Sequence, residues 1–181
     1  MQDLVRTARS PGTLMASPLG EMDETICICC QHARATVAVA GEPLCPTCLP
    51  AYALDTPHID EIASLIWLPQ CDQGVLSRLT LALHSACAQQ GETISTASTG
   101  QAGHAAAIFA ELRALAGELI KRIGTAQISH LREAARKLSQ APLQRQHVAS
   151  GIRVLHHGVG LPDEPDSYRH YLNTLKEGSS S

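Results

Sequence analysis

The stretch ICICCQHARATVAVAGEPLCPTCL, residues 26–49, decides the fold expected of this 181-residue chain. It holds two pairs of cysteines, Cys27 with Cys30 and Cys45 with Cys48. Two residues separate the members of each pair, and fourteen residues lie between the pairs. Two thiolates three positions apart on a tight turn can both reach one ion at about 2.3 Å, and two such turns (zinc knuckles) complete a tetrahedron. The spacing therefore predicts one structural Zn²⁺ ion bound by these four cysteines.

The residues between the pairs predict how the two knuckles meet. The sequence ATVAVAGEPL alternates β-branched and small residues and then reaches a glycine turn, which is typical of a short β-hairpin. Pro46 lies inside the second pair, where a turn accepts its fixed φ angle. We therefore expect a small zinc-binding β-hairpin module at residues 26–55.

The cysteines could instead form disulfides, act as redox pairs or be inert, and the sequence helps to choose among these interpretations. A disulfide framework needs an oxidising compartment, and the first twenty residues show no apolar run of signal-peptide length, so we expect a cytoplasmic protein. A redox pair is possible for one motif, but two motifs without a βαβ pattern favour metal over redox or inert thiols. Cys29 or His32 could replace one ligand. A full set of four thiolates leaves no position for water, so the metal would stabilise the fold without catalysing a reaction.

Composition limits the classes of partner. The formal net charge is −3, and the 14 lysines and arginines are scattered without a run longer than two. A nucleic-acid-binding protein usually carries a basic stripe, so nucleic acid is not an expected partner. No apolar stretch approaches the roughly 20 residues that cross a bilayer. We therefore expect no direct membrane insertion, and any association with a membrane would be peripheral and through partners.

The rest of the chain predicts a mainly α fold around the metal module. Composition and glycine or proline breaks divide it into a flexible N-terminal arm at 1–25, an apolar connector and helix at 56–90, a Ser/Thr/Gly-rich linker at 91–103, a helical region at 104–177 and a disordered tail at 178–181. Trp67 is the only tryptophan, and we expect it to anchor a core between the metal module and the helices.

Helix boundaries follow from capping residues. Thr56 before Pro57 predicts a helix start, and Asp72 predicts another. The second of these helices has the expected apolar face Val75, Leu76, Leu79, Leu83, Ala86 and Cys87. A long helix is expected at 105–123, ended by Gly124, and a further helix is capped by Thr125. The last helix, opened by Pro165 and Asp166, presents one apolar side made of Tyr168, Tyr171, Leu172 and Leu175.

Catalytic motifs are missing from the sequence. It has no nucleophile elbow, no HExxH and no glutamate placed after a histidine as in zinc deaminases, so we expect no catalytic residues and no enzyme. His156 and His157 form a pair beside glycines, but adjacent side chains point apart, and we interpret both as loop histidines. Cys71 and His84 are possible metal donors that four knuckle cysteines make unnecessary.

The segment SLIWLPQCDQGVLSRLTLAL, residues 64–83, together with the two knuckles, resembles the DotN (IcmJ) family, the zinc-binding component of type IVB secretion systems. In that family two cysteine knuckles precede an apolar piece of the form LI-aromatic-LP, a polar capping region and a helix. The matching positions here are the four cysteines, then Leu65, Ile66, Trp67, Leu68 and Pro69, then the helix from Gln73. The resemblance covers residues 27–84. Family members carry a longer segment between the knuckles, so a shortened HNH-like module is implied.

The resemblance implies a non-enzymatic cytoplasmic subunit of a coupling complex at the inner membrane. Such a subunit binds an extended segment of the coupling ATPase and helps to present effector proteins or a conjugative DNA complex for export. Two alternatives remain: a small zinc-finger regulator that binds nucleic acid or another protein, and a zinc-dependent hydrolase. The first requires salt-sensitive nucleic-acid binding when its partner is DNA or RNA, and the second requires an open position on the metal.

Overall fold

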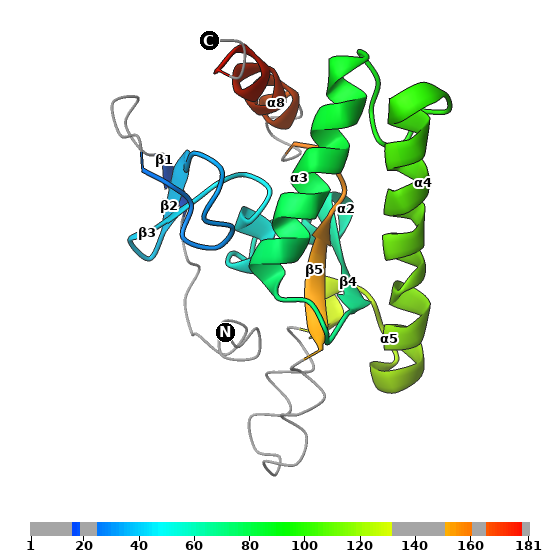
Figure 1. Ribbon diagram of the computed structural model, residues 1–181. Coiled ribbons are helices and arrows are strands. Elements are labelled where there is room, and N and C mark those ends of the chain that lie inside the picture. Colours follow the sequence, from blue (N-terminus) through cyan, green and yellow to red (C-terminus); the bar gives the residue numbers. More distant parts are fainter. Residues whose placement is uncertain (1–15, 19–24, 132–150, 161–165, 179–181) are drawn as a thin grey trace.

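The computed structural model describes residues 16–18, 25–131, 151–160 and 166–178 (Figure 1). Its elements, in chain order, are β1 (Ala16–Pro18), β2 (Val37–Val39), β3 (Glu42–Leu44), the 3₁₀ turn η1 (Leu49–Ala51), α2 (Ile59–Ile62), β4 (Ala63–Trp67), α3 (Gln73–Gln89), α4 (Gly100–Ala114), α5 (Ala116–Ile123), β5 (Ile152–His156) and α8 (Ser167–Gly178). The described part of the chain is thus a mixed fold with two small antiparallel sheets, β1–β2–β3 and β4–β5. Among the described residues no helix has both the length and the apolar character needed to cross a membrane.

The predicted hairpin is confirmed as β2 and β3, which pair with Val37 opposite Leu44. Ala40 and Gly41 connect them and both have positive φ, at 52° and 84°. Two central residues with positive φ define the turn whose twist matches paired strands. The predicted flexible arm needs one correction, because its residues Ala16–Pro18 form β1 and pair with β2. β1 thereby satisfies the backbone hydrogen-bonding groups on the side of β2 that faces away from β3.

The second sheet was not predicted. β4 pairs along its whole length with β5, placing Leu65 opposite Val154. Helical spacing of isoleucines had suggested one helix or extended segment from Thr56 onward, but α2 lasts only four residues. The predicted cap at Thr56 is wrong, because its hydroxyl donates to the Ala53 carbonyl at 2.6 Å and closes the turn after η1. Single-sequence spacing could not reveal that a partner strand lay about ninety residues further along the chain.

Helix α3 runs between the β1–β2–β3 sheet and α4 (Figure 1). Its predicted cap is confirmed, since the Asp72 carboxylate accepts a hydrogen bond from the Val75 N–H at 2.8 Å. Its predicted apolar face is only partly right. Leu76, Leu83 and Cys87 are buried, whereas Val75 and Leu79 are 40% and 41% exposed. The helix is turned about its axis relative to the prediction, because the side that carries Gly74 and Arg78 packs on the first knuckle.

Close backbone contact joins α3 to that knuckle. A Cβ atom at Gly74 would lie 2.3 Å from the Cys29 carbonyl oxygen, so only glycine permits this approach. One turn later, the Arg78 guanidinium donates to the Cys30 carbonyl at 3.0 Å. These two contacts fix the first knuckle on the N-terminal half of α3.

The predicted long helix at 105–123 is two helices, α4 and α5, that meet at Leu115. The Leu115 carbonyl accepts from both the Leu119 and the Trp67 N–H groups at 3.4 Å, so β4 approaches the helix at the break. The start is also earlier than predicted, because Gly100 opens α4 inside the expected linker. The predicted stop is confirmed, with Gly124 at φ 82°.

Trp67 is partly buried on β4, and Arg122 lies 4.5 Å over its ring. The apolar cluster against which it packs joins Ala51 and Leu54 of the predicted module to α2, β4, β5 and Leu119 of α5, in agreement with its predicted role. A Cβ atom at Gly151 would lie 2.5 Å from the Trp67 ring.

The helix predicted after Thr125 begins at residue 128 and is capped by the Asp60 carboxylate, which accepts from the Ile128 N–H at 2.6 Å. The rest of that helix beyond residue 131, Pro165 and residues 179–181 of the predicted tail lie outside the described residues.

The C-terminal helix α8 docks through a buried polar cluster. The Tyr168 hydroxyl forms hydrogen bonds with Thr47 of the second knuckle at 3.0 Å and with Nδ1 of His84 on α3 at 2.8 Å. The ring of His156 lies 4.4 Å from the Tyr168 ring, centroid to centroid. His156 is therefore a buried residue at the end of β5, which corrects its interpretation as a loop histidine. His157 follows the strand and places Nε2 3.0 Å from the Ser64 hydroxyl.

Burial makes this cluster sensitive to acid. It lowers the pKa of His84 to about 3, with a smaller contribution from His157. In an unfolded chain the pKa is about 6.5, so below that pH the unfolded state binds the proton more readily and stability falls as the pH drops toward 3. At pH 5 we expect His84 alone to cost about 2 kcal/mol of unfolding free energy. Urea unfolding at pH 7.5 and pH 5 measures the loss.

The His84→Gln variant should lose about 2 kcal/mol less than the wild type between these two pH values, because the amide does not titrate. Comparing the losses cancels the contribution of the cysteines, which both proteins share. His104→Gln, on the exposed side of α4, is the matched control and should behave as the wild type. Equal pH dependence in all three proteins would contradict the prediction.

Candidate metal centre

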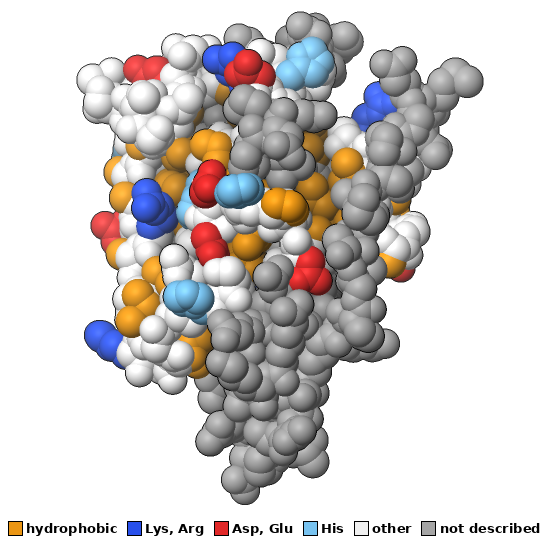
Figure 2. All heavy atoms as spheres, turned by 180° about the vertical axis from the view of Figure 1, so that it is seen from behind, with side chains coloured by type: hydrophobic (Ala, Val, Ile, Leu, Met, Phe, Trp, Pro, Cys, Tyr) orange, Lys and Arg blue, Asp and Glu red, His pale blue; other side chains and the backbone are white. Residues whose placement is uncertain are grey.

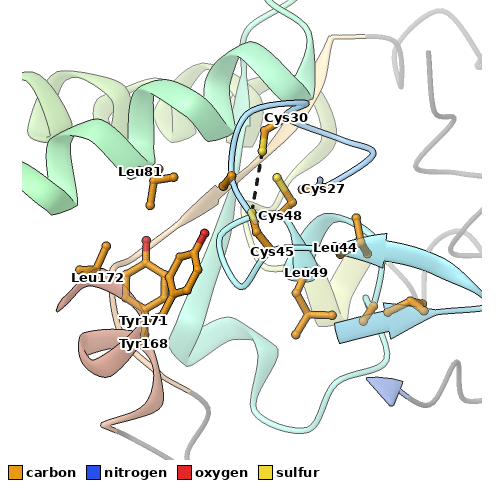
Figure 3. Packing of buried hydrophobic residues seen from close by; sticks show 13 residues of the cluster. Cys27, Cys30, Leu44, Cys45, Cys48, Leu49, Leu81, Tyr168, Tyr171 and Leu172 are labelled. Carbon is orange, nitrogen blue, oxygen red and sulfur yellow. Dashed lines mark hydrogen bonds between the residues drawn. The ribbon is translucent and has the colours of Figure 1, made fainter. Parts of the chain in front are cut away.

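Four sulfur atoms meet in the interior of the β1–β2–β3 module. The Sγ atoms of Cys27, Cys30, Cys45 and Cys48 all lie within 4.8 Å of one another, and all four residues are buried (Figure 3). The Sγ atoms of Cys30 and Cys45 are 3.9 Å apart. A tetrahedral zinc site with bonds of about 2.3 Å has sulfur atoms about 3.8 Å apart, whereas a disulfide requires about 2.05 Å. The geometry fits one ion between the sulfurs and does not fit disulfides.

The first knuckle is a tight turn closed by its own backbone. The Cys27 N–H donates to the Ala33 carbonyl, and the Gln31 N–H donates to the Cys27 carbonyl, both at 2.9 Å. Gln31 has φ 53°, the left-handed conformation that reverses the chain after Cys30. This turn holds Cys27 and Cys30 on the same side of the loop.

The second knuckle continues directly from the hairpin. The N–H groups of Cys48 and Leu49 both donate to the Cys45 carbonyl at 3.0 Å, which turns the chain into η1. The hairpin also touches the first knuckle, because the Ile28 N–H donates to the Pro43 carbonyl at 2.9 Å. The predicted role of the hairpin, to bring one knuckle to the other, is therefore confirmed.

Burial and crowding govern the charge of the cluster. The pKa values of Cys45 and Cys48 are raised, chiefly by hydrogen-bonding contact with the Cys27 sulfur, and burial raises them further. The pKa of Cys30 is lowered instead, and contact with Cys27 is again the largest cause. Four thiolates so close together and so well buried repel one another strongly, and a divalent cation removes this repulsion. Metal uptake by such a cluster releases protons.

The other candidate donors lie elsewhere. Cys29 is partly buried, and its carbonyl oxygen faces Gly74 on α3; His32 is exposed; neither belongs to the group of four. Cys71 contacts the Asp72 carbonyl at 3.4 Å, and Cys87 is buried against α4. Within the described residues, the four predicted cysteines form the one His/Cys/Asp/Glu group that meets metal-binding geometry.

Two tyrosines beside the sulfurs were not predicted as part of the site. Tyr168 and Tyr171 of α8 belong to the same buried cluster as the four cysteines (Figure 3). Their helical spacing in the sequence correctly indicated one buried side of the last helix. Nothing in that spacing indicated which part of the molecule the side would cover.

A centre with four sulfur donors has no position left for a substrate or a water molecule. The arrangement suits a structural ion, which would link two turns of the chain and add its binding energy to the stability of the fold.

A scan of the sequence against protein-family models finds no match, and a search of curated proteins finds none either.

Proposed function

We propose that the chain is a zinc-stabilised adaptor whose metal module, a shortened treble clef related to the HNH-like type, has a structural and not a catalytic role. The observation that carries the proposal is the meeting of four buried cysteine sulfurs within 4.8 Å of one another. Cys27, Cys30, Cys45 and Cys48 would hold one Zn²⁺ ion. Because four thiolates complete the coordination, the function must come from the surface that the centre supports.

A groove of about 1020 Å³ beside the metal module supplies such a surface. Its walls are the segment after the first knuckle, the outer side of α3, and residues 171–175 of α8. His32, Arg34 and Arg78 lie along it, and no aspartate or glutamate is among the described residues that line it. The groove is therefore complementary to a peptide that combines acidic and apolar side chains.

The assignment to a type IVB secretion or conjugation system rests on the resemblance of residues 27–84 to the DotN (IcmJ) family, and the groove adds a place where a peptide could bind. In this proposal the chain is a cytoplasmic subunit that binds an extended segment of the coupling ATPase in the groove and so helps substrate export. Peptide binding in a preformed groove is a common mode for small scaffold domains. On the face shown in Figure 2, the described lysine and arginine side chains lie apart from one another, which does not favour a nucleic-acid surface.

The metal proposal predicts one zinc equivalent in the purified protein. Cys45→Ser should lose at least nine tenths of the bound zinc and lower the thermal midpoint of unfolding, because structural zinc contributes directly to folding energy. Plasma emission spectrometry measures the metal, and circular dichroism measures the midpoint.

Cys29→Ser is the matched control, since it removes the neighbouring thiol that the structure leaves outside the cluster. This variant should keep one zinc equivalent and the wild-type midpoint. Equal zinc loss in both variants, or a wild type without zinc after refolding with the metal, would rule out the four-cysteine site.

The groove proposal predicts that Ala82→Glu blocks partner binding. Ala82 is exposed on α3 and lines the groove, so a glutamate there brings bulk and negative charge without removing a contact of the fold. In pulldown and titration calorimetry with the purified coupling ATPase encoded in the same genome, binding should weaken by at least about tenfold.

Ala107→Glu is the control, because Ala107 is also exposed but lies on α4 outside the groove. It should bind as the wild type. Loss of binding in both variants would show that the contact lies elsewhere, and a zinc-loaded wild type that does not bind the ATPase would refute the adaptor proposal.

A further inference from the structure

Two tyrosine hydroxyls of α8 are buried, and among the described residues only that of Tyr168 has hydrogen-bond partners of ordinary geometry. The Tyr168 hydroxyl is shared between Thr47 at 3.0 Å and His84 at 2.8 Å. The Tyr171 hydroxyl is buried and makes no hydrogen bond of ordinary geometry with the described protein atoms. A buried hydroxyl without an acceptor has lost water and gained nothing in return, so its position requires an explanation.

The surroundings of Tyr171 point to the cysteines. The residue is 6% exposed and packs in the cluster that contains all four sulfurs. Figure 3 shows the rings of Tyr168 and Tyr171 extending from α8 beside the knuckle cysteines, with Leu81 of α3 above the rings.

A thiol and a metal-bound thiolate differ as acceptors. Protonated sulfur accepts hydrogen bonds weakly, whereas a thiolate carries negative charge and accepts strongly. Outer hydrogen bonds to metal ligands orient the ligand and adjust the affinity for the metal. When the ion is bound, Cys45 becomes the acceptor that the Tyr171 hydroxyl otherwise lacks.

We infer that the Tyr171 hydroxyl donates a hydrogen bond to the metal-bound thiolate of Cys45, so that α8 is held to the metal centre by an outer contact of the ion. The inference rests on the proposed zinc site. Tyr171 is a positioning residue that acts through a ligand. Because it also lines the groove together with Leu172 and Leu175, the ion sets the position of one wall of the proposed peptide site.

Tyr171→Phe tests the inference while keeping the ring and its packing. Zinc affinity, measured by competition with a chromophoric chelator, should weaken by about tenfold, the lower end of the effect of removing an outer-shell partner. In the Co²⁺-substituted protein, the thiolate-to-cobalt charge-transfer band should move to longer wavelength, because a sulfur relieved of a hydrogen bond gives up an electron more easily.

Tyr168→Phe is the matched control on the same helix. Its hydroxyl is occupied by Thr47 and His84, so its removal should leave the zinc affinity and the cobalt band at the wild-type values. Wild-type affinity and band position in Tyr171→Phe, or the same change in both variants, would overturn the inference while the metal site stood. A wild-type chain that takes up no metal would overturn both.

Discussion

Crowding of four buried sulfurs at one point is the constraint on which the rest of the structure depends. Each sulfur comes from a turn that the backbone closes by itself, so the positions of the four atoms follow from local hydrogen bonds and from one hairpin. Without a cation, burial and mutual repulsion oppose the charged state of such a cluster. With a divalent ion, the same closeness becomes a strong link between two segments of chain.

Other elements are arranged around that link. Helix α3 packs on the first knuckle through Gly74 and Arg78, and α8 reaches the second knuckle through Tyr168 and Thr47. The cysteines therefore form part of an apolar cluster with Leu81 and Leu172, and do not stand in a separate appendage. A change at the metal would be transmitted to both helices, because packed interiors respond to the displacement of even small groups.

The same arrangement relates the proposed chemistry to the proposed function. A fully coordinated ion offers no reactive position, but it can hold a surface in shape. The groove lies where the segment after the first knuckle, α3 and α8 meet, so each of its walls touches the metal module or an element fixed to it. Arg34 and Arg78 line this groove, in a chain whose formal net charge is −3.

Local patterns in the sequence determined the two cysteine knuckles, the hairpin between them, the cap at Asp72, the stop at Gly124 and the buried side of the last helix, because each depends on residues close together in the chain. Tertiary structure alone decided the pairing of β4 with β5, the break at Leu115 and the rotation of α3 that exposes Val75 and Leu79. It also decided that His84, His156 and Tyr168 meet in one buried cluster beside the second knuckle. Those outcomes depend on contacts between residues far apart in the chain, and no spacing within a single segment records its distant partner.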